Sequence, residues 1–228
     1  MILREWEQLP EWLKNADTRR YYDTLRRRKF DLFLKRVFDF IVAGILLVLL
    51  SPALILTAIL VKATSKGPVL YKQERLTTYG RKFKIFKFRT MIENADKLGS
   101  LVTLDNDSRV TKVGRFLRKV RLDEIPQLFN VLLGQMSFVG TRPEVQKYVD
   151  AYSDEMLATL LMPAGITSLA CISFKDEEKY LDSRESVEEK YIHEILPDKM
   201  RYNLEYLEKF NIFYDMKLML DTALAVLK

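Results

Sequence analysis

The longest apolar stretch of the chain runs from Phe40 to Val61, and none of its 22 residues is charged. A straight membrane-spanning helix needs about 20 apolar residues, so the stretch is long enough to cross a bilayer. Ser51 and Pro52 lie at its centre, however, and a proline inside a helix removes a backbone hydrogen bond and clashes with the preceding turn. The pattern therefore predicts two helices that meet at a break.

Both flanks of this stretch are basic, with Arg26, Arg27, Arg28, Lys29, Lys35 and Arg36 before it and Lys62 and Lys66 after it. Short segments rich in lysine and arginine tend to stay in the cytoplasm. A helix pair that enters the membrane and returns on the same face satisfies both flanks, and the Ser51 hydroxyl can bind a backbone group that the proline releases. We predict such a re-entrant pair over residues 33–66, with a proline-kinked span and a buried core hairpin as alternatives.

Residues 1–32 combine a helical pattern, interrupted at Pro10, with Trp6 and Trp12 near one end and a basic cluster at the other. Tryptophan and basic side chains together are typical of helices that lie in a membrane interface. We therefore predict an N-terminal interfacial helical extension. The last helix, "NIFYDMKLMLDTALAVLK", is apolar enough either to lie on lipid or to close the core.

Lysine and apolar residues alternate in "GPVLYKQER" and "RKFKIFKFRT", which predicts two strands joined by a turn at residues 77–80. The alternation slips at Ile85 and Phe86, which predicts a bulge. From Val110 onward the period is helical except for a break near Asp123, and Lys112, Arg115, Arg118 and Lys119 share a face. The predicted fold is α+β and mostly helical: a monotopic membrane protein with a re-entrant helix pair, a small β-hairpin, amphipathic interfacial helices and a cytosolic domain over residues 67–228.

Charge is unevenly distributed. Residues 62–121 carry 16 basic and 5 acidic side chains, whereas residues 122–228 carry 11 and 19. A basic block directly after a membrane segment suits anionic lipid, phosphate-bearing substrates or nucleic acid. Cys171 and His193 are the only cysteine and histidine, which excludes an intrachain disulfide and makes a zinc site or a histidine-based triad improbable. The chemistry must then depend on carboxylates, basic groups and a hard metal ion.

Adjacent carboxylates at Asp123 and Glu124 separate a basic helix from the apolar helix "IPQLFNVLL". An aspartate before a helix is usually its N-cap, so the pair alone says little. Arg118 and Arg121 precede it closely, and "GTRPE" follows about 18 residues later. A carboxylate among cations, beside a second carboxylate that can bind Mg²⁺, can attack phosphorus and form an acyl phosphate.

Several motifs in order resemble the small monotopic phosphoglycosyl transferases, also called bacterial sugar transferases: "LKRVFDF", the Ser-Pro break, "GPVLYKQER", "FKIFKFRTM", "RVTKVGRFLRKVRLDEIPQLFNVLLGQMSFVGTRPE", "PAGITS" and "DMKLMLDT". The resemblance implies a re-entrant helix on the cytoplasmic face of a bacterial inner membrane, with both termini cytoplasmic. It also implies that sugar 1-phosphate passes from a UDP-sugar to undecaprenyl phosphate through an aspartyl phosphosugar intermediate, with release of UMP and initiation of lipid-linked glycan synthesis.

On this resemblance Asp123 and Glu124 are catalytic and hold Mg²⁺, for which Mn²⁺ can substitute. The expected substrate-binding residues are Arg118, Arg142, Pro143, Lys87, Arg89 and Arg75. The expected partners are the UDP-sugar, undecaprenyl phosphate, membrane phospholipid and a second copy of the chain, but not nucleic acid.

The sequence departs from the family pattern at Thr141, which replaces a proline of "GPRP", and at Asn203, where many members have aspartate. "RPGITG" becomes "MPAGITS", with Met162, an inserted alanine and Ser168. These departures keep a second hypothesis open: a basic peripheral module that binds anionic lipid or scaffolds a glycan pathway without catalysis. Nucleic-acid binding is a third and more distant hypothesis.

Overall fold

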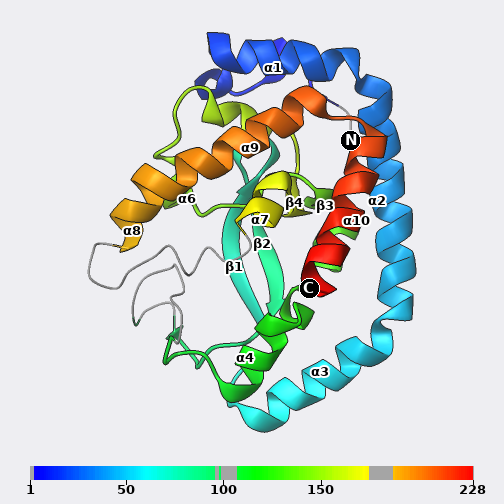
Figure 1. The fold of residues 1–228 in the computed structure, drawn as a ribbon, viewed down its shortest axis with the longest axis vertical. Coiled ribbons are helices and arrows are strands. Elements are labelled where there is room, and N and C mark those ends of the chain that lie inside the picture. The colour runs from blue at the N-terminus through cyan, green and yellow to red at the C-terminus, as the bar shows by residue number, and fades with distance from the viewer. Residues whose placement is uncertain (1–2, 96–97, 99–106, 175–186, 228) are drawn as a thin grey trace.

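The computed structural model describes residues 3–95, 98, 107–174 and 187–227 of the protein (Figure 1). Helices predominate, and the four strands in these residues form two small two-stranded sheets. The predicted α+β, mostly helical class with a small hairpin is confirmed.

The N-terminal segment packs onto the rest of the chain. It contains two 3₁₀ turns and a helix, namely η1 (Trp6–Gln8), η2 (Glu11–Leu13) and α1 (Ala16–Arg27). Asn15 caps α1 by accepting a hydrogen bond of 2.7 Å from the Thr18 amide. Leu3, Leu9 and Leu13 are buried in the main hydrophobic cluster. The segment is therefore part of the core; its location in a membrane interface stays a prediction.

The long apolar stretch forms two helices, α2 (Lys29–Leu49) and α3 (Ser51–Thr64), which bend by 63° at Leu50. Pro52 lies in the first turn of α3, where its missing N–H costs least. The Ser51 hydroxyl donates a 2.8 Å hydrogen bond to the Val48 carbonyl, as predicted for the break. Within the described residues, no individual helix is long and apolar enough to cross a membrane; the bent pair α2 and α3 meets these criteria only when both helices are taken together.

The predicted hairpin is present as β1 (Leu70–Thr77) and β2 (Arg81–Phe88), joined by the turn η3 (Thr78–Gly80). The predicted bulge at Ile85 and Phe86 is wrong, because the antiparallel pairing runs without a skipped residue from Leu70 opposite Phe88 to Thr77 opposite Arg81.

The slip in alternation has another cause: both faces of β2 are covered at its C-terminal end, from Ile85 to Phe88. Phe83 and Ile85 point to the main core, while Phe88 points to the opposite face and packs with Val61 of α3 and Leu117 of the next helix. Since Lys87 follows Phe83 and Ile85 in the period of two, it lies on their face of the hairpin.

The predicted helix, break and helix around Asp123 are confirmed. They are α4 (Lys112–Lys119), the 3₁₀ turn η5 (Leu122–Glu124) and α5 (Gln127–Leu132). The second sheet follows, in which β3 (Met136–Val139) runs parallel to β4 (Ala164–Thr167). In chain order, α6 (Gln146–Val149) and η6 (Met156–Leu161) come between β3 and β4.

The C-terminal part is helical and comprises α7 (Leu169–Ser173), α8 (Val187–Lys190), the π-helical turn η8 (Tyr191–Ile195), α9 (Leu196–Lys209) and α10 (Ile212–Leu227). In Figure 1, α9 lies beneath α1, and α10 runs beside α2. Helix α10 closes part of the core through Leu218, as predicted, whereas Phe213, Leu220 and Leu224 are exposed; contact of this helix with lipid stays a prediction.

Candidate active site

The turn η5 carries the two adjacent carboxylates between two short helices. Thr111 caps the start of α4 by accepting a 2.9 Å hydrogen bond from the Gly114 amide. Arg121, after the end of α4, has a φ of 57°, and this left-handed residue turns the chain into η5. Pro126 precedes α5, which has no side-chain cap. Asp123 therefore is not a helix cap, which was the ordinary structural explanation for an aspartate at this position.

Asp123 is 7% exposed, and no hydrogen-bond partner of its Oδ1 is found in the described part of the chain. Burial raises the pKa of Asp123, and the neighbouring charge of Glu124 raises it further; the charges of Lys87 and Arg118 oppose this shift. An unpaired buried carboxylate oxygen lowers the stability of the fold, so its presence calls for an explanation such as a catalytic role.

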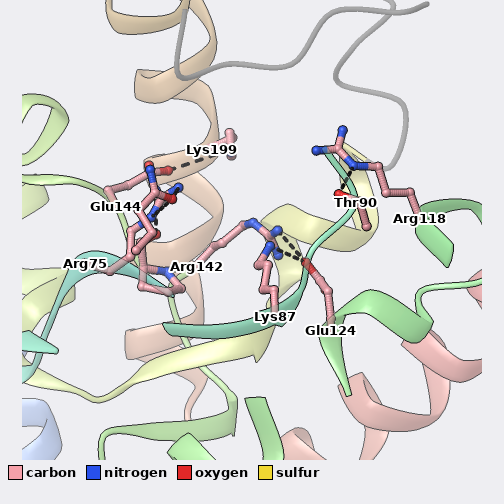
Figure 2. Close-up of polar contacts among 10 residues, drawn as sticks. Arg75, Lys87, Thr90, Arg118, Glu124, Arg142, Glu144 and Lys199 are labelled. Carbon is pink, nitrogen blue, oxygen red and sulfur yellow. Dashed lines mark hydrogen bonds and ion pairs between the residues drawn. The ribbon is translucent and has the colours of Figure 1, made fainter. Parts of the chain in front are cut away.

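Glu124 is held by two cations (Figure 2). Its Oε1 lies 2.8 Å from Lys87 Nζ and 2.7 Å from Arg142 Nη2. Burial alone would raise the pKa of Glu124, but Arg142 and Lys87 together hold it well below its usual value. Burial lowers the pKa of Lys87, partly offset by Glu124, whereas Glu124 raises that of Arg142. Glu124 is thus an ionised carboxylate shared by two positive side chains.

Arg142 reaches the site from the loop that follows β3. The backbones of β3 and β4 approach very closely there, because a Cβ added at Gly165 would lie 2.2 Å from the Gly140 amide nitrogen. A 3.0 Å hydrogen bond from the Gly140 amide to the Thr167 carbonyl continues the pairing, and a 2.9 Å hydrogen bond from the Gly165 amide to the Thr141 carbonyl holds the loop against β4. The loop leaves the carboxyl end of a parallel strand pair, the edge at which α/β sheets commonly bind ligands.

A second buried cluster anchors the same loop to the hairpin. The Arg75 guanidinium donates to the Pro143 carbonyl at 3.2 Å and lies 3.4 Å from Glu144 Oε2. Tyr191, in the π-helical turn, donates a 2.6 Å hydrogen bond to Glu144 Oε1, and Lys199 Nζ donates to the Tyr191 hydroxyl at 3.1 Å. This cluster fixes the backbone immediately after Arg142.

The two remaining arginines lie near the residues that follow β2: Arg89 comes directly after this strand, and Arg118 reaches Thr90 from α4. Arg118 Nε donates a 3.0 Å hydrogen bond to the Thr90 hydroxyl and lies near enough for its charge to lower the pKa of Asp123. Arg89 donates to the carbonyl and the hydroxyl of Ser65 at the end of α3.

The structure thus brings Glu124, Lys87 and Arg142 together, with Arg118 farther along the same site (Figure 2). Asp123 lies near enough to Glu124, Lys87 and Arg118 for their charges to shift its pKa. Arg75 and Pro143 belong to the adjoining cluster. Sequence reasoning missed Asn130, a fully buried residue whose amide accepts from the Phe86 amide at 3.0 Å and donates to the Lys84 carbonyl at 2.8 Å. It ties α5 to β2, and the signal was available: a polar residue inside the apolar helix "IPQLFNVLL".

The departures from the family pattern have identifiable surroundings. Ser168 caps α7 by accepting a 3.0 Å hydrogen bond from the Cys171 amide. Thr141 is buried and pairs through its carbonyl with Gly165. Asn203 is 2% exposed on α9, and its Oδ1 finds no partner among the described residues.

Asp123 and Glu124 could hold a divalent cation only with help from a substrate. Mg²⁺ is commonly bound by one or two carboxylates together with substrate phosphates. Two adjacent carboxylates, one with an unpartnered oxygen, fit that donor set. In the described ranges, no group of three or more His, Cys, Asp or Glu side chains is arranged to hold a metal ion.

Comparison with known proteins agrees with the motifs. Residues 30–228 match the family described as bacterial sugar transferase. The chain belongs to this family. The resemblance seen in the sequence is confirmed over almost the whole chain, and only the N-terminal 29 residues lie outside the match.

The relatives of this chain are named for different sugars. A UDP-glucose:undecaprenyl-phosphate glucose-1-phosphate transferase from Klebsiella pneumoniae is 40% identical over 199 residues, which cover 85% of this chain and 40% of that protein. A UDP-N-acetylgalactosamine-undecaprenyl-phosphate N-acetylgalactosaminephosphotransferase from Aeromonas hydrophila is 35% identical over 86% of this chain and 44% of its own. The chain therefore spans about two fifths of the length of these relatives. The exopolysaccharide production protein ExoY from Rhizobium meliloti is 32% identical, with 84% of each chain covered.

Proposed function

We propose that this chain transfers sugar 1-phosphate from a UDP-sugar to undecaprenyl phosphate and so initiates the synthesis of a lipid-linked glycan. The observation that carries the proposal is the buried, unpartnered Oδ1 of Asp123 beside a glutamate that two cations hold. The family relationship and the printed activities of the relatives support the same reaction class.

In the first step Asp123 Oδ1 attacks the β-phosphorus of the UDP-sugar. The bond from that phosphorus to the bridging oxygen breaks, UMP leaves with the bond electrons, and the sugar phosphate stays on Asp123 as an acyl phosphate. In the second step a phosphate oxygen of the lipid attacks the same phosphorus, the bond to Asp123 breaks, and the carboxylate is restored. The described site offers no histidine for this chemistry, and the mechanism requires none.

The positive side chains would offset the negative charge of the diphosphate substrate. A diphosphate beside Asp123 places several negative charges in a partly buried site, where their repulsion is stronger than in water. Lys87 and Arg142 already stand at Glu124, and Arg118 lies near Asp123. The planar guanidinium of Arg142 is suited to hold two phosphate oxygens at once. When bound by Asp123 and Glu124, Mg²⁺ would supply further neutralisation of the diphosphate.

We also propose that α2 and α3 form a re-entrant pair that attaches the enzyme to the cytoplasmic face of the bacterial inner membrane. The support is the bend of 63° and the large apolar side chains exposed on both helices: Phe30, Phe33, Phe40, Ile41, Ile45, Val48, Leu49, Ile55, Leu56 and Ile59. Large apolar patches on a protein surface commonly mark sites of contact with a membrane or with another protein. It would keep the site within reach of a lipid-borne acceptor.

A scaffold that only binds anionic lipid is the competing function, and a covalent adduct distinguishes the two. Purified protein is incubated with a panel of UDP-sugars and without lipid acceptor, and its intact mass is measured. Wild type should gain one phosphosugar and release an equal amount of UMP, whereas Asp123→Asn should gain nothing. Glu74→Gln is the matched control, because Glu74 is an exposed carboxylate that pairs with Lys82 on the hairpin. Lipid product without any trapped adduct after rapid quenching would contradict the two-step mechanism.

A further inference from the structure

Arg89 forms a cap at the end of α3. Its Nη2 donates to the carbonyl oxygen of Ser65 at 2.9 Å and to the hydroxyl of Ser65 at 2.7 Å, and the side chain is 6% exposed. Ser65 is the C-cap residue of α3. The last carbonyls of a helix lack partners within the helix, and a positive charge at this end is favourable. Arg89 therefore stabilises the terminus of the second helix of the bent pair.

The backbone between α3 and β1 packs directly on this guanidinium at Gly67. Gly67 has a φ of 106°, a conformation that residues with a side chain rarely adopt. A Cβ at Gly67 would lie 2.4 Å from Arg89 Nη1. The backbone conformation therefore strongly favours glycine here, and a side chain at this position would also displace the end of the Arg89 guanidinium.

The next residue, Thr90, holds α4 in a corresponding way. Its carbonyl accepts a 2.9 Å hydrogen bond from the Thr111 amide at the start of α4, and its hydroxyl accepts from Arg118. A Cβ at Gly114 would lie 1.9 Å from the Thr90 carbonyl oxygen. Helix α4 therefore packs on this residue too closely to allow a side chain at position 114. Two consecutive residues therefore join α3 and α4 to the end of β2, just beyond Lys87.

We propose that Arg89 is a positioning residue that fixes the apolar helix α3 relative to the cation site, so that the phosphate of a lipid-borne acceptor reaches Asp123. The inference rests on the proposed function. A UDP-sugar is soluble and arrives from water, so its binding does not depend on how α3 is oriented. The acceptor phosphate is tied to a membrane lipid, and its height above the bilayer relative to Asp123 depends on the helices that face the lipid.

The two half-reactions separate this role from direct phosphate binding by Arg89. Arg89→Met keeps an unbranched, apolar side-chain stem but removes the guanidinium and with it the cap. Thr64→Val is the matched control, since within the described residues the Thr64 hydroxyl donates to the Leu60 carbonyl of its own helix. In Arg89→Met, single-turnover adduct formation with a UDP-sugar alone should stay within about twofold of wild type. Transfer from the adduct to polyprenyl phosphate in vesicles should fall about tenfold, equivalent to about 1.4 kcal/mol in the barrier. An equal fall in adduct formation would overturn the positioning role and make Arg89 a donor-binding residue.

A distance measurement tests the proposal independently of any activity. Spin labels are placed at Leu56→Cys on α3 and Arg115→Cys on α4, in a Cys171→Ser background, and their separation is measured in vesicles. The distribution should be narrow in the parent protein and in Thr64→Val, and broad or displaced in Arg89→Met and Gly67→Ala. An unchanged distribution in both variants would refute the positioning role, even if sugar phosphate is transferred. A changed distribution in a protein that never forms an adduct would support the cap and refute the proposed reaction.

Discussion

Lys35 of α2 and Asp215 of α10 form a buried ion pair in which Nζ lies 2.5 Å from Oδ2. Lys35 also donates a 2.8 Å hydrogen bond to the Val139 carbonyl at the end of β3, and the Tyr206 hydroxyl donates to Asp215 at 2.7 Å. Lys35 was counted in the sequence as part of a basic flank, but its side chain is 1% exposed. It therefore joins the bent helix pair to the C-terminal helix and to the strand that leads to Arg142.

The first prediction concerns this pair. Removing one partner of a buried ion pair leaves the other charge uncompensated and typically costs about 3–5 kcal/mol. Lys35→Met and Asp215→Leu should each lower the free energy of unfolding by about this amount, measured by denaturant unfolding in detergent. The double variant should lose clearly less than the sum of the two single losses. Lys29→Met is the control, because Lys29 pairs with Glu5 at the surface, where such pairs contribute about 0–1 kcal/mol.

The second prediction concerns the shape of the cation at Glu124. Arg142→Lys keeps the positive charge but loses the planar fork that can hold two phosphate oxygens. Loss of one preorganised donor to a developing charge commonly costs about 10²–10³ in kcat, so we expect kcat/KM for UMP release to fall on the order of 10²-fold. Arg81→Lys serves as the control, because Arg81 is exposed on the same hairpin and, among the described residues, its side chain bonds to the Gly134 carbonyl, away from Glu124. Full activity of Arg142→Lys would exclude bidentate binding by this residue.

The sequence predicted those features that local signals determine. The helix break at Ser51 and Pro52, the hairpin turn and the interruption at Asp123 each depend on a proline, a turn or a change of period within a few residues. The predicted bulge failed because burial of Phe88 against α3 depends on the tertiary fold, which period-two reasoning on one strand does not contain.

The pairing within the site could not be predicted in the same way. Glu124 meets Lys87 across 37 positions and Arg142 across 18, and these contacts exist only because β2 and the loop after β3 converge. The family resemblance predicted which residues belong to the site, but not which of their side chains pair with one another. Arg89 illustrates the difference: it was expected at the substrate, and the structure shows it bound to Ser65. Whether it also contacts substrate stays a prediction.

The third prediction follows from the raised pKa of Asp123. An aspartate in the unfolded chain has a pKa of about 3.9, and burial raises it in the folded protein. The buried charge therefore lowers stability at high pH, and this cost disappears as pH falls through the folded-state pKa toward about 3.9. Asp123→Asn should be more stable than wild type at neutral pH, and the difference should shrink on acidification, measured by thermal unfolding against pH.

Asp107 provides a control of opposite sign for this measurement. The hydrogen bond from the Arg109 side chain holds the pKa of Asp107 below its usual value, so ionised Asp107 stabilises the fold. Asp107→Asn should be less stable than wild type at neutral pH, and that deficit should shrink as pH falls through the folded-state pKa. If both variants change with pH in the same direction, the burial of Asp123 does not control its ionisation.

The last prediction concerns the N-terminal segment, which lies outside the family match and packs on the tip of the hairpin. The Arg4 amide donates a 3.0 Å hydrogen bond to the Tyr79 hydroxyl, and a Cβ added at Gly80 would lie 2.7 Å from the ring of Trp12. Gly80 also has a φ of 71°, which costs roughly 1–2 kcal/mol for a residue with a side chain. Gly80→Ala should therefore lower the free energy of unfolding by about 1–3 kcal/mol, from backbone strain and from contact with the ring.

A double variant separates these two contributions. In the Trp12→Ala background the ring is absent, so Gly80→Ala should lower the free energy of unfolding only by the part due to its left-handed backbone. The difference between the losses in the two backgrounds is the free energy of the contact between residue 80 and the Trp12 ring. Gly44→Ala on α2 is the matched control: no atom lies within 4 Å of its added Cβ, and alanine favours a helix over glycine by about 1 kcal/mol, so stability should rise. An equal cost of Gly80→Ala with and without Trp12 would show that contact with the Trp12 ring contributes nothing to this cost, and that the loss comes from the left-handed backbone alone.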